Sequence, residues 1–106
     1  MLKLSDNLAI NIKNINAVVY RDDIDRVVIY TNENGNNIEH TSSLESYLTY
    51  IRELQLSFVI CGEFIINDNR LIKMTYKNGI VSLSFEGNFN LHVGGGHANI
   101  IWNQLC

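Results

Sequence analysis

The chain has 106 residues, of which 46% are hydrophobic and 18% charged, with a formal net charge of −3 and an isoelectric point of about 5.5. A chain of this length hides roughly 60–70% of its unfolded surface, so residues 1–106 are expected to form a single domain with a substantial core. The acidic balance is untypical of nucleic-acid-binding domains, which use basic residues to displace counterions from phosphates.

The first forty residues predict short β-strands, because apolar residues alternate with polar ones or gather in β-branched runs. The expected strands are one or two within Leu2–Asn14, then Ile15–Tyr20, Arg26–Thr31 and Asn37–Thr41, the last at a sheet edge. The charged loop Arg21–Asp25 joins two of them as a hairpin. A turn follows at residues 32–36, where Gly35 supplies the positive φ of a tight turn.

An amphipathic helix is predicted after the fourth strand. Ser42 and Glu45 have the spacing of a capping box, in which each side chain bonds the backbone of the other. Apolar side chains at helical spacing define its buried face: Leu44, Tyr47, Leu48, Ile51 and Leu54. In so short a chain this face is expected to cover a sheet rather than bind a partner.

The rest of the chain predicts antiparallel strands and a short helix. The strands are Phe58–Cys61, Glu63–Asn67, Arg70–Tyr76, Ile80–Phe85 and Phe89–Val93, and the helix is His97–Leu105. Alternation places Ile72, Met74 and Tyr76 on one face of their strand. Asn78-Gly79 predicts a type I′ hairpin turn. In the terminal helix the packing candidates are Ile100, Ile101, Trp102 and Leu105.

Residues with reactive or metal-binding side chains are few. Cys61, His92 and His97 do not have the spacing of a zinc site, and Cys61 has apolar neighbours that favour packing over nucleophilic catalysis. With only two cysteines, no apolar leader and no run long enough for a membrane span, we expect a cytoplasmic protein with reduced thiols. Neither an enzyme, a metal site, a cofactor nor a small-molecule substrate is predicted.

Two features suit an anionic partner but also have ordinary explanations. Arg70, Lys73 and Lys77 form the one local positive stripe, which fits a phosphate backbone or plain solvent exposure. Gly94–Gly96 stand at the start of a helix, where free N–H groups can bind an anion, or where a flexible turn is needed.

The element order and several positions match a known pattern. Ser43-Leu44 and Leu48 match the start of its helix, and the central block matches at Phe58, Phe64, Ile66, Asn67 and Ile72. On these residues the chain resembles the LytTR-type DNA-binding domains, from about Leu8 to Leu105. The resemblance implies a mostly β fold: stacked small antiparallel sheets, one amphipathic helix and a short C-terminal helix.

The resemblance also implies a bacterial-type transcription regulator that binds double-stranded DNA, as a homodimer or with a related regulator. The family contacts DNA through the loop of the first hairpin, a His-Arg turn in the central block and a basic turn before the last helix. Here these segments are Arg21–Asp25, Cys61-Gly62 and Gly94–Gly96, so the base-contact positions are degenerate. The expected DNA-binding residues are Arg21, Arg26, Asn67, Arg70, Lys73, Lys77 and Gly95. The alternative is a LytTR-like module that has lost DNA reading and acts through protein–protein interaction.

Overall fold

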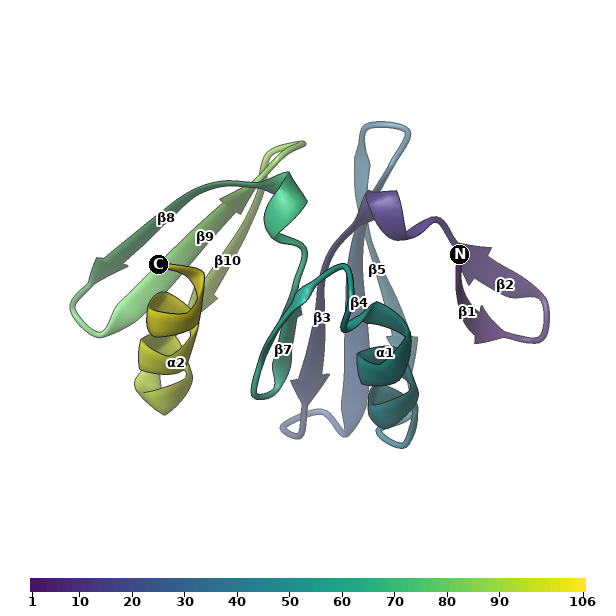
Figure 1. Ribbon diagram of the computed structural model, residues 1–106. Coiled ribbons are helices and arrows are strands. Elements are labelled where there is room, and N and C mark those ends of the chain that lie inside the picture. Colours follow the sequence, from purple (N-terminus) through teal and green to yellow (C-terminus); the bar gives the residue numbers. More distant parts are fainter.

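Three antiparallel sheets make up most of the molecule, a computed structural model that describes Met1–Cys106 (Figure 1). The first sheet pairs β1 (Leu2–Ser5) with β2 (Leu8–Ile10). The central sheet has the order β5-β4-β3-β7-β6, with β3 (Ile15–Arg21), β4 (Arg26–Glu33), β5 (Asn36–Ser42), β6 (Val59–Cys61) and β7 (Phe64–Ile66). The third sheet has the order β10-β9-β8, with β8 (Leu71–Lys77), β9 (Ile80–Phe85) and β10 (Phe89–Val93).

Two helices and two 3₁₀ turns complete the fold. They are α1 (Ser46–Leu54), α2 (Gly95–Leu105) and the turns Ile12–Asn14 and Asp68–Arg70. The second turn joins an N-terminal lobe, residues 1–69, to a C-terminal lobe, residues 70–106, which lie side by side in Figure 1. The molecule is accordingly elongated, at 42 × 28 × 26 Å. The mostly β prediction with stacked sheets and two helices is confirmed.

The inner strands β3, β4 and β7 of the central sheet are buried on both faces, which explains their continuous apolar runs, whereas the edge strand β5 is mostly exposed. Along β3, Val18 points into a core with α1 and the β1–β2 pair, while Ala17 and Val19 point into a second core. The second core is completed by the C-terminal lobe, through residues such as Leu83 and Ile101. The two lobes therefore share this second core, and close packing within it sets their relative position.

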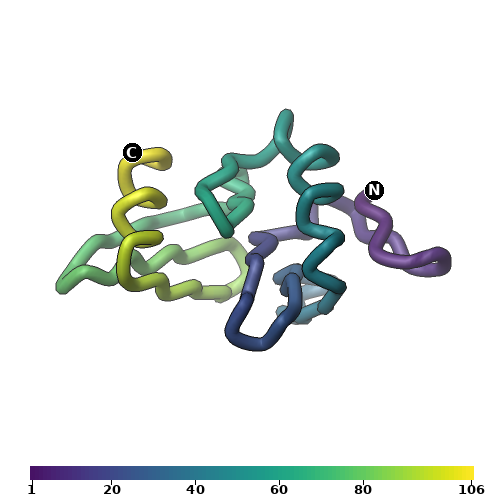
Figure 2. Tube along the Cα trace, turned by 90° about the horizontal axis from the view of Figure 1, so that it is seen from below, coloured from purple at the N-terminus to yellow at the C-terminus, as the bar shows by residue number.

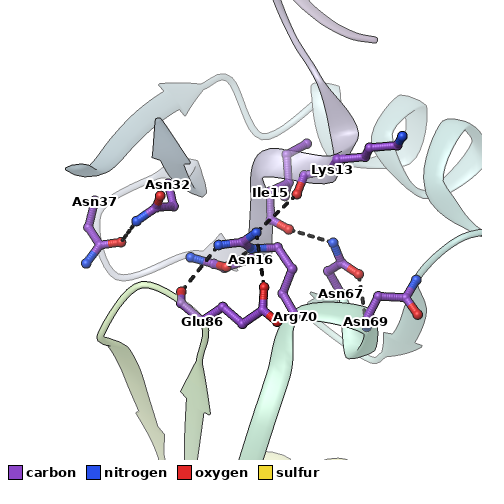
Figure 3. Close-up of polar contacts among 9 residues, drawn as sticks. All are labelled: Lys13, Ile15, Asn16, Asn32, Asn37, Asn67, Asn69, Arg70 and Glu86. Atoms are coloured by element: carbon purple, nitrogen blue, oxygen red, sulfur yellow. Dashed lines mark hydrogen bonds and ion pairs between the residues drawn. The ribbon is translucent and has the colours of Figure 1, made fainter. Parts of the chain in front are cut away.

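A polar network ties the lobes together at one end (Figure 3). Asn67 Nδ2 donates to the Ile15 carbonyl at 2.8 Å, and Arg70 Nε donates to Asn16 Oδ1 at 2.7 Å. Arg70 also donates to the Lys13 carbonyl at 3.4 Å and to the Glu86 carbonyl at 3.3 Å. The side chains of Asn67 and Arg70 thus satisfy buried acceptors where the chain passes between lobes.

The predicted turns are confirmed, whereas the start of the first helix is not. Asn78 and Gly79 have φ values of 55° and 75°, as a type I′ turn requires. No capping box forms, because Ser42 ends β5 and its hydroxyl accepts from the Tyr50 hydroxyl at 2.9 Å. The helix begins only at Ser46, with Glu45 as a cap that makes no side-chain bond.

The buried face of α1 differs from the predicted one. Leu48, predicted in the core, is 69% exposed, and Tyr50 takes a buried position instead. Tyr47, Tyr50 and Leu54 follow one another at helical spacing and form the buried stripe. The Leu48 prediction was wrong because the sheet meets the side of the helix that carries the tyrosines.

Two further apolar residues are exposed against expectation. A bulge in the pairing of β8 with β9 brings Leu71, rather than Ile72, to the inner face with Met74, and Ile72 is 68% exposed. The terminal helix begins at Gly95, two residues earlier than predicted. It buries Ala98 and Ile101, while Ile100 is 43% exposed. Alternation and helical spacing alone did not reveal the bulge or the rotation of the helix.

Candidate nucleic-acid interface

Three loop segments from different parts of the chain meet around one cleft of about 410 Å³. Its walls come from the first hairpin (Tyr20–Asp23), the β6–β7 turn (Glu63 and Phe64), and the end of β10 with the start of α2 (His92 and His97). In Figure 1 these segments lie at the lower end, opposite the polar network that joins the lobes. They are the segments that the resemblance singled out, and the fold brings them together.

The hairpin tip carries its charges in an arrangement that leaves little positive potential. The Arg21 guanidinium binds Asp23 through two bonds of 2.7 and 3.2 Å, and these bonds hold the pKa of Asp23 below its ordinary value. Asp22 and Asp25 form no ion pair, and Arg26 reaches Thr41 Oγ1 at 3.3 Å. The tip therefore presents more free carboxylates than free guanidinium groups.

The β6–β7 turn is held from two sides. The Tyr47 hydroxyl donates to the Gly62 carbonyl at 3.0 Å, and the Tyr20 amide donates to the Glu63 carbonyl at 2.9 Å. Gly62 has φ = 62° and open space around it, so a glycine suits the turn for its conformation rather than for close packing. The anchored turn presents the Glu63 side chain to the cleft.

The start of α2 closes the third side of the cleft. His97 stands edge-on to Phe64 with ring centroids 5.6 Å apart, and its Nε2 lies 4.0 Å from the Glu63 carboxylate. Gly94 and Gly95 precede it without a side-chain cap, so the first amide groups of the helix are free of such a partner. A Cβ added to Gly94 would lie 3.9 Å from Ile80 Cγ1, so this end of α2 borders the β8–β9 hairpin.

The predicted DNA-binding residues lie in four places. Arg21 and Arg26 lie on the hairpin tip and Gly95 at the start of α2, while Lys73 and Lys77 lie on the outer side of β8. The remaining two residues lie at the opposite end of the molecule. There Asn67 is 3% exposed, the Arg70 side chain is 17% exposed, and both bond within the protein.

The cleft also contains residues that the sequence analysis did not connect. Glu63 and His97 are 34 positions apart in the chain and meet only because α2 packs beside the β6–β7 turn. No local motif marks this pair, and only a prediction of which elements pack together would have found it.

Other reactive side chains are separated from one another. No three His, Cys, Asp or Glu side chains gather in a way that would hold a metal ion. Cys61 is 1% exposed, and burial raises the pKa of its thiol, while His92 Nδ1 lies 2.8 Å from Ser82 Oγ. Neither α1 nor α2 has the length and apolar character that a membrane-spanning helix requires.

Comparison with known proteins identifies the fold through structure rather than sequence. No family model matches the sequence, and no curated protein does either. Among solved structures the chain is similar to the LytTr DNA-binding domain of a protein described as a methyl-accepting/DNA response regulator from Bacillus cereus. The TM-score is 0.61 at 20% sequence identity, and the match covers 98% of this chain and 93% of that one. Both lobes lie within this match, and the chain therefore has the fold of a LytTr DNA-binding domain.

Proposed function

We propose that this protein is a DNA-binding transcription regulator domain of the LytTR type, with degenerate base-contact positions. One observation carries the proposal: the hairpin tip, the β6–β7 turn and the start of α2 border one cleft. A likeness of fold alone does not define a function, whereas this arrangement retains the family's contact segments on one edge of the molecule. We expect a cytoplasmic protein without catalytic activity, in which residues 1–106 act as one domain.

The proposed contacts are mainly with phosphates. Among the expected contact residues, Arg21, Arg26, Lys73 and Lys77 are the basic side chains outside the polar network, and the amide of Gly95 offers a backbone donor. With about four phosphates neutralised, log K should fall with log salt at a slope of roughly −3 to −4. Asn67 and Arg70 hold the two lobes in position through bonds at the end opposite the cleft, so their contribution to the interface is indirect.

Fluorescence anisotropy with labelled double-stranded DNA, titrated at low and at moderate salt, tests the proposal. We expect binding in the micromolar range at low salt, with a steep loss as salt increases. Random and promoter-derived duplexes should differ little in affinity, since Gly62 and Gly94–Gly96 offer no side chain to base edges. Absence of binding at tens of micromolar protein in low salt would contradict the proposal.

A second candidate function follows from the acidic side of the cleft. Asp22 and Glu63 line the cleft and Asp25 lies on the same hairpin tip, so carboxylates stand where a DNA-binding edge needs positive charge. Such an edge favours a LytTR-like module that pairs with a basic surface on a related regulator, or with a second copy of itself. Sedimentation of the protein alone and mixed with such a regulator tests this. The second function would be favoured by two results together. The wild-type protein forms a complex that is lost when Asp22 and Asp25 are changed to Asn, and the wild-type protein does not bind DNA.

A further inference from the structure

Charge is divided unevenly between the two lobes. Residues 1–69 contain five basic and ten acidic residues, whereas residues 70–106 contain three basic and one acidic. The acidic residue is Glu86, whose carboxylate lies 3.6 Å from the Arg70 guanidinium at the joint between lobes. Lys73 and Lys77 remain, and neither forms an ion pair within the protein. An acidic chain therefore contains one lobe with excess positive charge.

The two lysines share one face of the third sheet, which we name the outer face. Strand pairing sets Lys73 beside Ser84, and Ser84 beside Asn90, in one row of side chains. The neighbouring row runs from Thr75 through Ser82 to His92. Lys77 extends the same side of β8. The outer face consists of Lys73, Thr75, Lys77, Ile80, Ser82, Ser84, Asn90 and His92, with no carboxylate among them.

No other element of the fold covers the outer face, although His92 at its edge also lines the cleft. Val81, Leu83 and Phe85 point to the opposite side of β9, where they enter the core with α2. Seen from below, α2 lies on one side of the third sheet and nothing covers the other (Figure 2). Apart from the half-exposed Ile80, every side chain of the outer face is a cation or a hydrogen-bonding group, so burying this face against an apolar partner would be unfavourable.

We infer that the outer face binds the sugar–phosphate backbone of a DNA duplex; this inference rests on the proposed function. Lys73 and Lys77 are four residues apart on one strand, about 13 Å at 3.3 Å per residue, so each reaches a different phosphate. Ser, Thr and Asn side chains between them supply neutral donors of the kind that contact phosphates. A carboxylate-free, cationic face is complementary to a polyanion, in contrast to the acidic hairpin tip.

The outer face is continuous with the cleft. Ile80 pairs with Lys77 across the β8–β9 hairpin, and it also lies beside Gly94 at the start of α2. A duplex that touches the first turn of α2 can therefore extend along the outer face. In this arrangement the C-terminal lobe supplies most of the affinity, while the hairpin tip of the N-terminal lobe contributes little because of its carboxylates.

Substitution of the two lysines tests the inference. Lys73→Gln and Lys77→Gln should each weaken DNA binding several-fold at low salt, and each should lower the slope of log K against log salt by about one. Lys3→Gln and Arg52→Gln remove the same charge from exposed positions of the N-terminal lobe and should leave that slope unchanged. Thermal unfolding followed by circular dichroism verifies that all four variants fold.

A nearly isosteric change provides an independent test. Asn90→Asp adds one negative charge to the outer face, whereas Asn36→Asp adds it to an exposed position of β5 in the other lobe. Only Asn90→Asp should weaken binding markedly. If the wild-type protein binds DNA but the variants of Lys73, Lys77 and Asn90 behave like their controls, the outer face is excluded and the proposed function stands. Absence of binding by the wild type overturns both.

Discussion

Arg70 Nε donates a hydrogen bond of 2.7 Å to Oδ1 of Asn16, a residue 54 positions earlier whose side chain is completely buried. The bond connects the start of the C-terminal lobe to the central sheet. The same guanidinium also reaches the carbonyls of Lys13 and Glu86. A side chain that looks like a phosphate contact in sequence therefore serves as a bridge between lobes, because its donors satisfy acceptors that water does not reach.

Loss of this bridge should destabilise the protein. We expect Arg70→Met to lower the free energy of unfolding by about 2–3 kcal/mol, since it leaves the Asn16 oxygen buried without a donor. The free energy of unfolding of Arg70→Lys should lie between those of the wild type and Arg70→Met. Its ammonium group keeps a donor but lacks the planar fork that reaches several acceptors. Urea unfolding measures both, and Arg52→Met on the exposed side of α1 is the control. Equal losses for Arg70→Met and Arg52→Met would contradict the bridge.

Two glycines with similar backbone angles should tolerate alanine differently. Gly79 has φ = 75° and nothing near its missing Cβ, whereas a Cβ on Gly87, φ = 83°, would overlap the Asn32 amide. That amide donates to Asn37 Oδ1 at 3.0 Å, and Asn37 in turn donates to the Gly87 carbonyl. Gly79→Ala should cost about 1–2 kcal/mol of stability for the backbone angle alone. Gly87→Ala should lower the free energy of unfolding by about 1 kcal/mol more, as measured by urea unfolding. Equal losses for the two variants would show that the Asn32 side chain moves aside without cost.

The two thiols should differ in reactivity. Cys61 is buried and its burial raises the pKa of the thiol, while Cys106 is exposed. Because the thiolate is the reactive form and access is needed, an aromatic disulfide reagent should modify one thiol per native chain. Cys106→Ser should abolish the rapid reaction, and denaturant should restore one reactive thiol. Rapid modification of Cys61 in the native Cys106→Ser variant would contradict its position in the core.

Tyr47 should make the protein sensitive to alkaline pH. Burial raises the pKa of its hydroxyl, with smaller contributions from Glu63 and Cys61, so the folded state keeps the proton where the unfolded state loses it. Its contribution to stability therefore falls as pH rises above the unfolded value of about 10. Tyr47→Phe should cost about 1 kcal/mol at neutral pH, through the lost bond to the Gly62 carbonyl, and less near pH 11. A pH-independent difference in urea unfolding would contradict this.

Asp23 should restrain DNA binding by occupying Arg21. Asp23→Asn removes one negative charge and also releases the guanidinium, whereas Asp22→Asn removes the same charge beside it and releases nothing. If the proposed function holds, Asp23→Asn should increase DNA affinity more than Asp22→Asn and steepen its salt dependence. In the presence of Arg21→Ala the two substitutions should have equal effects. Anisotropy titrations measure these affinities, and equal effects with Arg21 intact would show that the ion pair does not limit binding.

The strands, the hairpin turns and the existence of both helices were predictable, because their signals are local. Alternation in Ile80–Phe85 and the Asn78-Gly79 pair each depend on neighbouring residues, and the structure confirms both. The exposed Leu48 and Ile72 were not predictable in the same way. Which side of α1 meets the sheet, and where β8 bulges, depend on segments distant in the chain.

By itself, the sequence determined the order of the elements, the turn geometries and the sign of the net charge, since these follow from backbone preferences and composition. Only the tertiary structure decided which polar residues are structural and which are exposed. Arg70 and Lys73 look alike in the sequence, yet one bridges two lobes and the other faces solvent on an uncovered sheet. The physical reason is that a charged side chain's role depends on nearby acceptors, and for Arg70 that acceptor lies on a distant strand.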